Sequence, residues 1–146
     1  METIYQRKIF CIAMYKTGTT SFGEAMRKFN LRSFFGPWEK VIESIEGESS
    51  WNFPEEEFLK KYSNELIELI SKFDAFNDFP FIFIYKWLAK KYPDALFVFL
   101  ERDPISLAKS DLLMWERYKV VPWKLPKKEK FIERYLKHKE NVLEFF

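Results

Sequence analysis

The sequence lacks the features that mark several large classes of protein. It contains one cysteine, Cys11, so no disulfide can form within the chain. No run of 18 apolar residues is present, which predicts no transmembrane helix, and the acidic start at Glu2 does not fit a signal peptide. These absences favour a cytoplasmic protein without a membrane segment. In such a protein Cys11 is better interpreted as a buried thiol than as a catalytic one.

A strong excess of charge of one sign is also lacking. The chain has 24 Lys and Arg residues against 22 Asp and Glu residues, which gives no general attraction to nucleic acid or to anionic membranes. We therefore expect no nucleic-acid partner. The 146 residues are 47% hydrophobic and include 17 phenylalanines, which predicts a globular chain with a bulky core. This length fits a single domain over residues 1–146.

The ordinary P-loop pattern, G-x-x-x-x-G-K-[ST], is absent as well, but a related strand–loop–helix pattern occurs near the N-terminus. Residues 9–14 form an apolar run typical of a buried strand. Residues 16–21 then contain one cation, one glycine and four hydroxyls, and apolar residues follow at helical spacing: Phe22, Ala25, Met26 and Phe29. The N–H groups at a helix N-terminus, together with Lys16, predict a site for phosphate or sulfate. The alternative is a helix capped by Ser or Thr, with Lys16 merely solvated.

A second stretch repeats this arrangement. Residues 95–100 read as a strand, Arg102 follows it, and Asp103 and Pro104 suit the N-cap and first turn of a helix. Ser110 lies eight residues after Arg102, on a similar helix face. An arginine at the carboxyl end of a strand can hold a phosphate through two hydrogen bonds. The alternative for Arg102 alone is a surface ion pair.

Taken together, the two stretches resemble the sulfotransferases that use 3′-phosphoadenosine 5′-phosphosulfate (PAPS). Residues 15–21, Tyr-Lys-Thr-Gly-Thr-Thr-Ser, are similar to the 5′-phosphosulfate loop P-K-[ST]-G-T-T, with Tyr15 in place of the usual proline. Arg102-Asp103-Pro104 with Ser110 resembles the 3′-phosphate site of the family, and residues 74–80 and 92–95 resemble one of its branches. The resemblance implies PAPS as cofactor, no metal, and these cofactor-binding residues: Lys16, Thr17, Gly18, Thr19, Thr20, Ser21, Arg102 and Ser110.

The resemblance also implies catalytic roles. Lys16 would neutralise the leaving oxygen, and Asp78, before Phe79-Pro80, stands where the cytosolic branch has a catalytic histidine before Leu-Pro. Asp78 is therefore the candidate general base, although a turn or cap residue is an equal alternative at this position. Glu24 is a rival base, with a solvated helix face as its simpler explanation. His138, the only histidine, fits a packed residue better than a catalyst.

Strand and helix patterns alternate along the chain. This alternation predicts an α/β fold of three layers, α/β/α, around a mostly parallel P-loop-type sheet. Strands are expected at residues 9–14, 31–35, 75–79 and 95–100, and helices after residue 20 and at residues 38–47, 54–73, 82–92, 104–117 and 127–146. The carboxyl ends of the strands would then bring Lys16, Asp78 and Arg102 to one edge of the sheet.

The C-terminus is expected to be shortened. Family members usually continue into one more strand and an acceptor-binding region after a segment like residues 135–142, whereas this sequence ends at Phe146. An unpaired edge beside the first strand would favour a homodimer. The acceptor is expected to be a hydroxyl or amine of a small molecule or a glycan, and four tryptophans could line its pocket or simply fill the core: Trp38, Trp87, Trp115 and Trp123.

Two other functions fit parts of the sequence. A P-loop nucleotide kinase or NTPase would need Mg²⁺ and an acid at a strand end, for which Glu101 is a candidate, but the Lys-Thr-Gly-Thr-Thr order argues against it. A remnant that binds nucleotide without catalysis would fit the shortened C-terminus. Transfer without a metal separates sulfotransferase from kinase, and measurable turnover separates sulfotransferase from remnant.

Overall fold

The computed structural model describes residues 7–14, 17–44, 54–110 and 128–146. The chain divides into two compact units. The first comprises residues 1–44 and 54–100 and holds the sheet; the second comprises residues 45–53 and 101–146. The sheet in the first unit carries the elements that position the candidate site.

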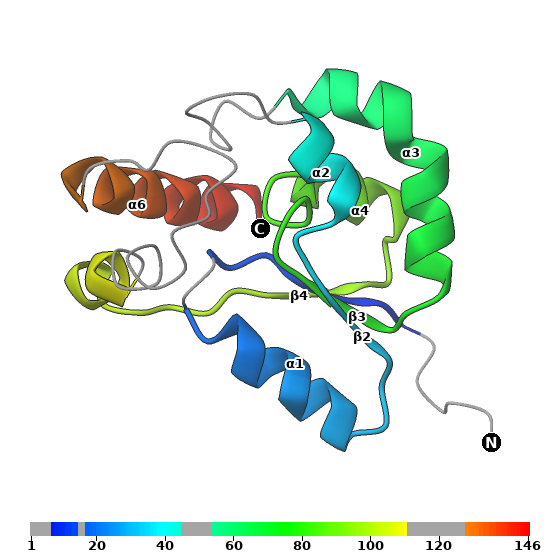
Figure 1. Ribbon diagram of the computed structural model, residues 1–146, viewed down its shortest axis with the longest axis horizontal. Helices are drawn as coiled ribbons and strands as arrows, with labels where there is room; N and C mark the ends of the chain where they lie inside the picture. Colours follow the sequence, from blue (N-terminus) through cyan, green and yellow to red (C-terminus); the bar gives the residue numbers. More distant parts are fainter. Residues whose placement is uncertain (1–6, 15–16, 45–53, 111–127) are drawn as a thin grey trace. The chain divides into compact units, whose positions relative to one another are not determined.

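Four short strands form this sheet: β1 (Ile9–Cys11), β2 (Ser33–Phe35), β3 (Ala75–Asn77) and β4 (Leu96–Val98). Their order is β2-β3-β1-β4 and all three pairings are parallel, as Figure 1 shows. The predicted α/β class and parallel sheet are thus confirmed. The expected open edge beside the first strand is wrong, because the chain crosses over after β3 and adds β4 on the other side of β1. Within the described sheet, β2 and β4 are the edge strands.

Helices lie on both sides of the sheet in the first unit. Helix α1 (Thr19–Lys28) lies on one side, and α2 (Glu39–Ser44), α3 (Glu55–Ser71) and α4 (Tyr85–Lys91) lie on the other (Figure 1). Helix α4 begins three residues later than predicted, because residues 79–84 form turns closed by bonds such as Ile84 N–H to the Pro80 carbonyl (3.2 Å). The end of the helix predicted at residues 38–47 lies outside the described residues.

The alternation of side chains along β1 gives the core two different halves. Ile9 and Cys11 pack with Phe22 of α1 in a small hydrophobic cluster. Phe10, between them in sequence, points to the opposite face, where its ring lies 5.1 Å from Phe76 and 5.9 Å from Phe81. The bulky aromatic core predicted from composition therefore lies on the side of α2, α3 and α4.

A glycine lets α1 approach the sheet closely. A Cβ atom at Gly23 would lie 2.2 Å from the Phe35 ring, a distance that no side chain tolerates. Phe29, predicted on the buried stripe of this helix, is instead 72% exposed, because α1 ends at Lys28 and Phe29 forms its C-cap. The apolar pattern extends one residue beyond the end of the helix.

In the second unit, residues 104–110 are helical, and α6 (Lys128–Phe145) follows. The predicted cap at Asp103 is confirmed, since the Ser106 N–H donates to its Oδ2 atom at 2.9 Å. Along α6 one stripe of side chains is buried: Phe131, Tyr135, His138 and Val142. The burial of His138 agrees with its interpretation as a packed residue, whereas Phe145, the last residue of the helix, is 43% exposed.

Candidate functional site

The N-terminus of α1 has no side-chain cap. The residue at its N-cap position is Gly18. The predicted alternative, a helix capped by Ser or Thr, is therefore wrong among the described residues. The Phe22 N–H donates to the Gly18 carbonyl (2.9 Å), whereas the N–H groups of the first turn have no partner within an α-helix. These N–H groups, with the exposed Thr20 and Ser21 nearby, are suited to an anion.

Glycine is required at the N-cap for a backbone reason. Gly18 has φ = 110°, in the region that residues with a side chain rarely adopt. Space is not the restriction, because the nearest atom to a Cβ placed there would be Leu100 Cδ1 at 3.9 Å. Before it, the Thr17 hydroxyl donates to the Met14 carbonyl and closes the loop. Lys16 itself lies outside the described residues.

Asp78 lies where β3 ends, at the same edge of the sheet as the start of α1. Its φ is 70°, a left-handed conformation that Asp and Asn tolerate better than other side chains. The Phe79 N–H donates to its Oδ1 atom at 2.8 Å. Burial raises the pKa of the Asp78 carboxyl to about 6, although this N–H opposes the rise. The carboxylate is thus both a turn residue and a stronger base than an ordinary aspartate.

A second glycine allows the end of β2 to approach Asp78 closely. Gly36, which directly follows β2, would place a Cβ atom 2.7 Å from Asp78 Cβ and 3.0 Å from the Phe79 carbonyl oxygen. The ends of β2 and β3 can therefore approach each other only with glycine at this position. This contact fixes the backbone that carries the Asp78 carboxylate.

Asn77 is a residue of this edge that the sequence prediction missed. It is 2% exposed, and its amide Nδ2 donates to the Thr19 carbonyl at 3.0 Å. This bond joins the end of β3 to the first residue of α1. The available signal was a polar residue inside an apolar strand, since Asn77 follows Ala75 and Phe76. Buried polar groups in such runs are usually hydrogen-bonded for a structural or functional reason.

The predicted 3′-phosphate residues belong to the second unit. Arg102 is exposed, and its backbone N–H donates to the Tyr135 hydroxyl at 3.2 Å, which anchors the start of this segment to α6. Ser110 is half-buried in the helix that Asp103 caps. Glu101, the candidate acid of the kinase alternative, forms an ion pair with Lys139 at 3.1 Å. The convergence of Arg102 with Lys16 and Asp78 stays a prediction, because Asp78 and Lys16 belong to the first unit.

Other candidate residues occupy ordinary structural positions. Cys11 is fully buried, and burial raises the pKa of its thiol to about 11, so the interpretation as a neutral core thiol holds. Glu24 is exposed on α1. Trp38 is buried edge-to-face against Phe58 and Tyr62. Trp115 and Trp123 lie outside the described residues.

Neither a metal-binding cluster nor a membrane-spanning helix occurs in the described parts of the chain. No group of three His, Cys, Asp or Glu side chains there could hold a metal ion. No described helix is long and apolar enough to cross a membrane.

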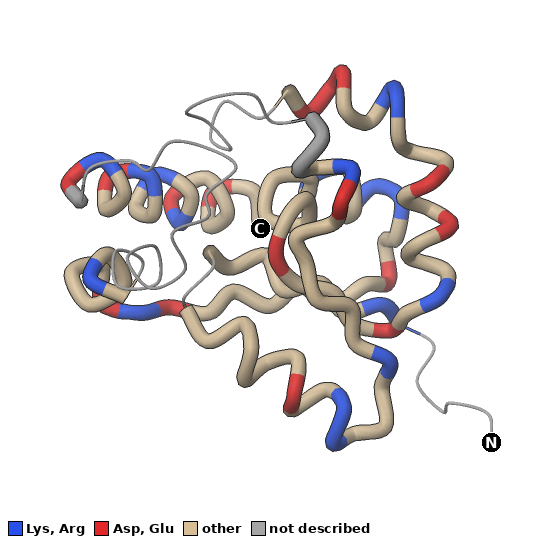
Figure 2. The backbone as a smooth tube through the Cα atoms, in the orientation of Figure 1, with Lys and Arg blue, Asp and Glu red and all other residues tan. Residues whose placement is uncertain are grey.

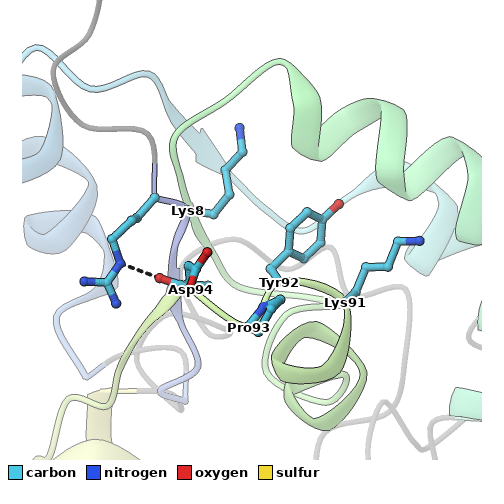
Figure 3. Close-up of a pocket in the computed structure, with 7 residues that line it drawn as sticks. Lys8, Lys91, Tyr92, Pro93 and Asp94 are labelled. Carbon is cyan, nitrogen blue, oxygen red and sulfur yellow. Dashed lines mark hydrogen bonds between the residues drawn. The ribbon is translucent and has the colours of Figure 1, made fainter.

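A hollow of about 760 Å³ lies at the opposite edge of the sheet, where β1 and β4 begin (Figure 3). Three cations line it, but the Arg7 guanidinium donates to the Asp94 carbonyl and the Lys8 ammonium donates to the Phe73 carbonyl at 2.5 Å. Figure 3 shows Lys8 and Lys91 extending in different directions. These cations do not converge on one ligand, so the carboxyl edge remains the candidate site.

Comparisons with known proteins give the family of the chain. A family model described as a sulfotransferase domain matches residues 8–146, a span that includes the loop at residues 16–21 as well as Asp78, Arg102 and Ser110. A comparison with curated proteins gave no match. Because the family match covers nearly the whole sequence, the chain belongs to the sulfotransferase domain family.

Proposed function

We propose that this protein transfers a sulfuryl group from PAPS to a hydroxyl or amine acceptor. The observation that carries the proposal is the start of α1, where a left-handed glycine replaces a side-chain cap. In a member of the sulfotransferase domain family, an open helix N-terminus of this kind is suited to the 5′-phosphosulfate of the donor. Family membership supports sulfuryl transfer, and the choice of PAPS as donor rests on this helix N-terminus.

Different residues would bind different parts of the donor. The N–H groups of the first turn of α1 and the hydroxyls of Thr19, Thr20 and Ser21 would bind sulfate and phosphate oxygens. Thr17 already donates its hydroxyl proton to the Met14 carbonyl, so its contribution would come from its backbone N–H. Arg102 and Ser110 would bind the 3′-phosphate, which distinguishes PAPS from ATP.

The chemical step needs one proton acceptor and one stabilised leaving group. The acceptor oxygen or nitrogen forms a bond to sulfur and gives its proton to the Asp78 carboxylate. The bond between sulfur and the bridging oxygen of the phosphate breaks, and 3′-phosphoadenosine 5′-phosphate (PAP) leaves with the additional negative charge, which Lys16 neutralises. A pKa of about 6 leaves Asp78 ionised at neutral pH and makes it a better base than an unperturbed aspartate.

Calorimetric titration with PAP tests the donor assignment directly. We expect PAP to bind without added metal and ATP to bind much more weakly, because only PAP carries a 3′-phosphate. No PAP binding by a folded chain would contradict the proposal. ATP binding that requires Mg²⁺ would favour the kinase alternative. Turnover of PAPS with a panel of hydroxyl and amine acceptors would then separate an enzyme from a binding remnant.

A further inference from the structure

We propose that Asn77 is a positioning residue for sulfuryl transfer, which holds the first turn of α1 and the Asp78 carboxylate in fixed register. The inference rests on the proposed function of the carboxyl edge. It concerns a side chain that would touch neither the donor nor the acceptor. Its effect would pass through the two groups that do.

The connection is short and buried. Asn77 is the last residue of β3, in register with Phe35 of β2, and it directly precedes Asp78. Its amide reaches the carbonyl of Thr19, a residue 58 positions away in the sequence, at 3.0 Å. With 2% exposure, the side chain has little access to water that could replace this partner. One side chain therefore ties the turn that carries the base to the helix start that would bind the anion.

The residue type suits this task. The amide donates to a carbonyl and leaves the N–H groups of the first turn of α1 available for the donor. A carboxylate at this position would place a negative charge beside the anion site and opposite a carbonyl oxygen. An apolar side chain would fill the space but could not donate a hydrogen bond to the Thr19 carbonyl at the start of α1. Asparagine supplies a neutral donor of the required length.

Positioning of this kind affects rate more than affinity. The donor would be held by many contacts along α1 and the second unit, so the loss of one anchor leaves most of its binding intact. In-line transfer, however, requires the sulfur and the acceptor activated by Asp78 to lie within a fraction of an ångström of the reactive geometry. A misplacement of about 1 Å can lower the rate about 100-fold.

The first variant is Asn77→Leu, which keeps the branching at Cγ and removes the donor. We expect kcat with PAPS to fall about 10- to 100-fold, while KM for PAPS and the Kd for PAP change less than about threefold. A fall in the melting temperature is expected, because leucine is larger than asparagine and leaves the Thr19 carbonyl without this donor, so kcat is compared per folded molecule. Ser33→Ala, in the neighbouring strand β2 and distant in sequence from the proposed machinery, is the control and should leave kcat unchanged.

The second variant is Asn77→Asp, which keeps the shape and adds a negative charge. We expect this charge to raise the Kd for PAP at least about tenfold in addition to lowering kcat. This variant has a readout of its own if Asn77→Leu does not fold. Parental PAP affinity in folded Asn77→Asp would overturn the inference.

Hydrogen–deuterium exchange of a peptide covering residues 17–24 gives a readout that does not depend on activity. Exchange at the start of α1 should rise in Asn77→Leu if the Asn77 amide holds this turn. Unchanged exchange, parental kcat, or a loss of kcat and PAP affinity that simply follows unfolding would each overturn the inference. If the parent chain itself shows no PAP binding and no turnover, the proposed function fails, and the exchange experiment still decides whether Asn77 anchors α1.

Discussion

The two edges of the parallel sheet give their aspartates opposite environments. At the amino edge, Asp74 is 6% exposed and accepts hydrogen bonds from the Arg32 N–H (2.7 Å) and guanidinium (3.1 Å). At the carboxyl edge, Asp78 accepts a bond from the Phe79 N–H, and the nearby helix start at Gly18 has no side-chain cap. Figure 2 shows charged residues gathered where the strands begin. At the amino edge the charged groups pair with one another, whereas at the carboxyl edge polar groups remain available.

The pKa shifts of the two aspartates express this difference. Burial acts to raise the pKa of Asp74, but the hydrogen bonds and charge of Arg32, with help from Lys8, reverse this and lower it. At Asp78 burial prevails and the pKa rises to about 6, because an N–H rather than a cation opposes it. The same side chain, four positions apart in sequence, thus serves stability at one edge and basicity at the other.

The largest effect is expected for Lys16→Ala. If Lys16 neutralises the leaving oxygen as proposed, its loss should lower kcat by at least about 100- to 1000-fold, since a single preorganised donor contributes about 3–4 kcal/mol to catalysis. The melting temperature should stay unchanged. Lys28→Ala, an exposed lysine in the last turn of α1, is the control. Equal losses in the two variants would show that general charge, and not the loop, supports activity.

Asp78→Asn should separate activity from stability. Asparagine has the same shape and also tolerates a positive φ, so the fold is retained. If Asp78 is the general base, as proposed, its removal should lower kcat about 100- to 1000-fold. Parental kcat would exclude Asp78 as the base. Glu24→Gln, which alters the rival carboxylate, should leave kcat near the parental value.

The same variant should be more stable than the parent at neutral pH. A folded pKa of about 6, above the ordinary value of about 3.9, means that the native state binds more protons between these values. Ionisation of Asp78 therefore removes stability as the pH rises from about 4 to 6, and the loss persists above that range. Denaturant unfolding should show Asp78→Asn about 1–3 kcal/mol more stable at pH 7 and equal to the parent near pH 4. The kcat of the parent should fall below pH 6 for the same reason.

The sequence predicted which elements form the carboxyl edge, but not the long-range contacts that hold them together. Apolar runs predicted all four strands, because period is a local property, but the predicted third strand ran to residue 79, whereas β3 ends at Asn77 and Asp78 forms a turn. Strand lengths, the position of β4 beside β1 and the exposure of Phe29 depend on where the chain meets other elements. The bond from Asn77 to Thr19 spans 58 positions, and no local pattern encodes such a contact.

Arg102→Ala tests whether the second unit contributes to the same site. If Arg102 binds the 3′-phosphate, its loss should weaken PAP binding by about 1.5–3 kcal/mol, or roughly 10- to 150-fold, in a calorimetric titration. Lys130→Ala, an exposed cation on α6 in the same unit, is the control. Parental PAP affinity in Arg102→Ala would mean that the cofactor contacts are confined to the first unit.

Asp74→Asn examines the amino edge. It removes the charge that pairs with Arg32, and we expect a loss of about 1–2 kcal/mol in the free energy of unfolding at pH 7, with kcat unchanged. The sign is opposite to that at Asp78. Because the folded pKa of Asp74 is lowered, its contribution is present above the ordinary pKa and is lost as the pH falls through the folded value. The difference between variant and parent should therefore narrow in acid, and a large loss of kcat per folded molecule would contradict the division between the edges.

The smallest effect is expected for Ser33→Ala, at the amino end of β2. Its Oγ atom is buried and has no hydrogen-bond partner among the described residues, so removal of the hydroxyl abolishes an unpaired polar group and breaks no bond. The free energy of unfolding should stay equal or rise by up to about 1 kcal/mol, because an unsatisfied buried hydroxyl is unfavourable. Denaturant unfolding measures this change, and kcat should be unaltered. A clear loss of stability would reveal a partner for Ser33 and would make the amino edge more dependent on hydrogen bonds than its ion pairs alone indicate.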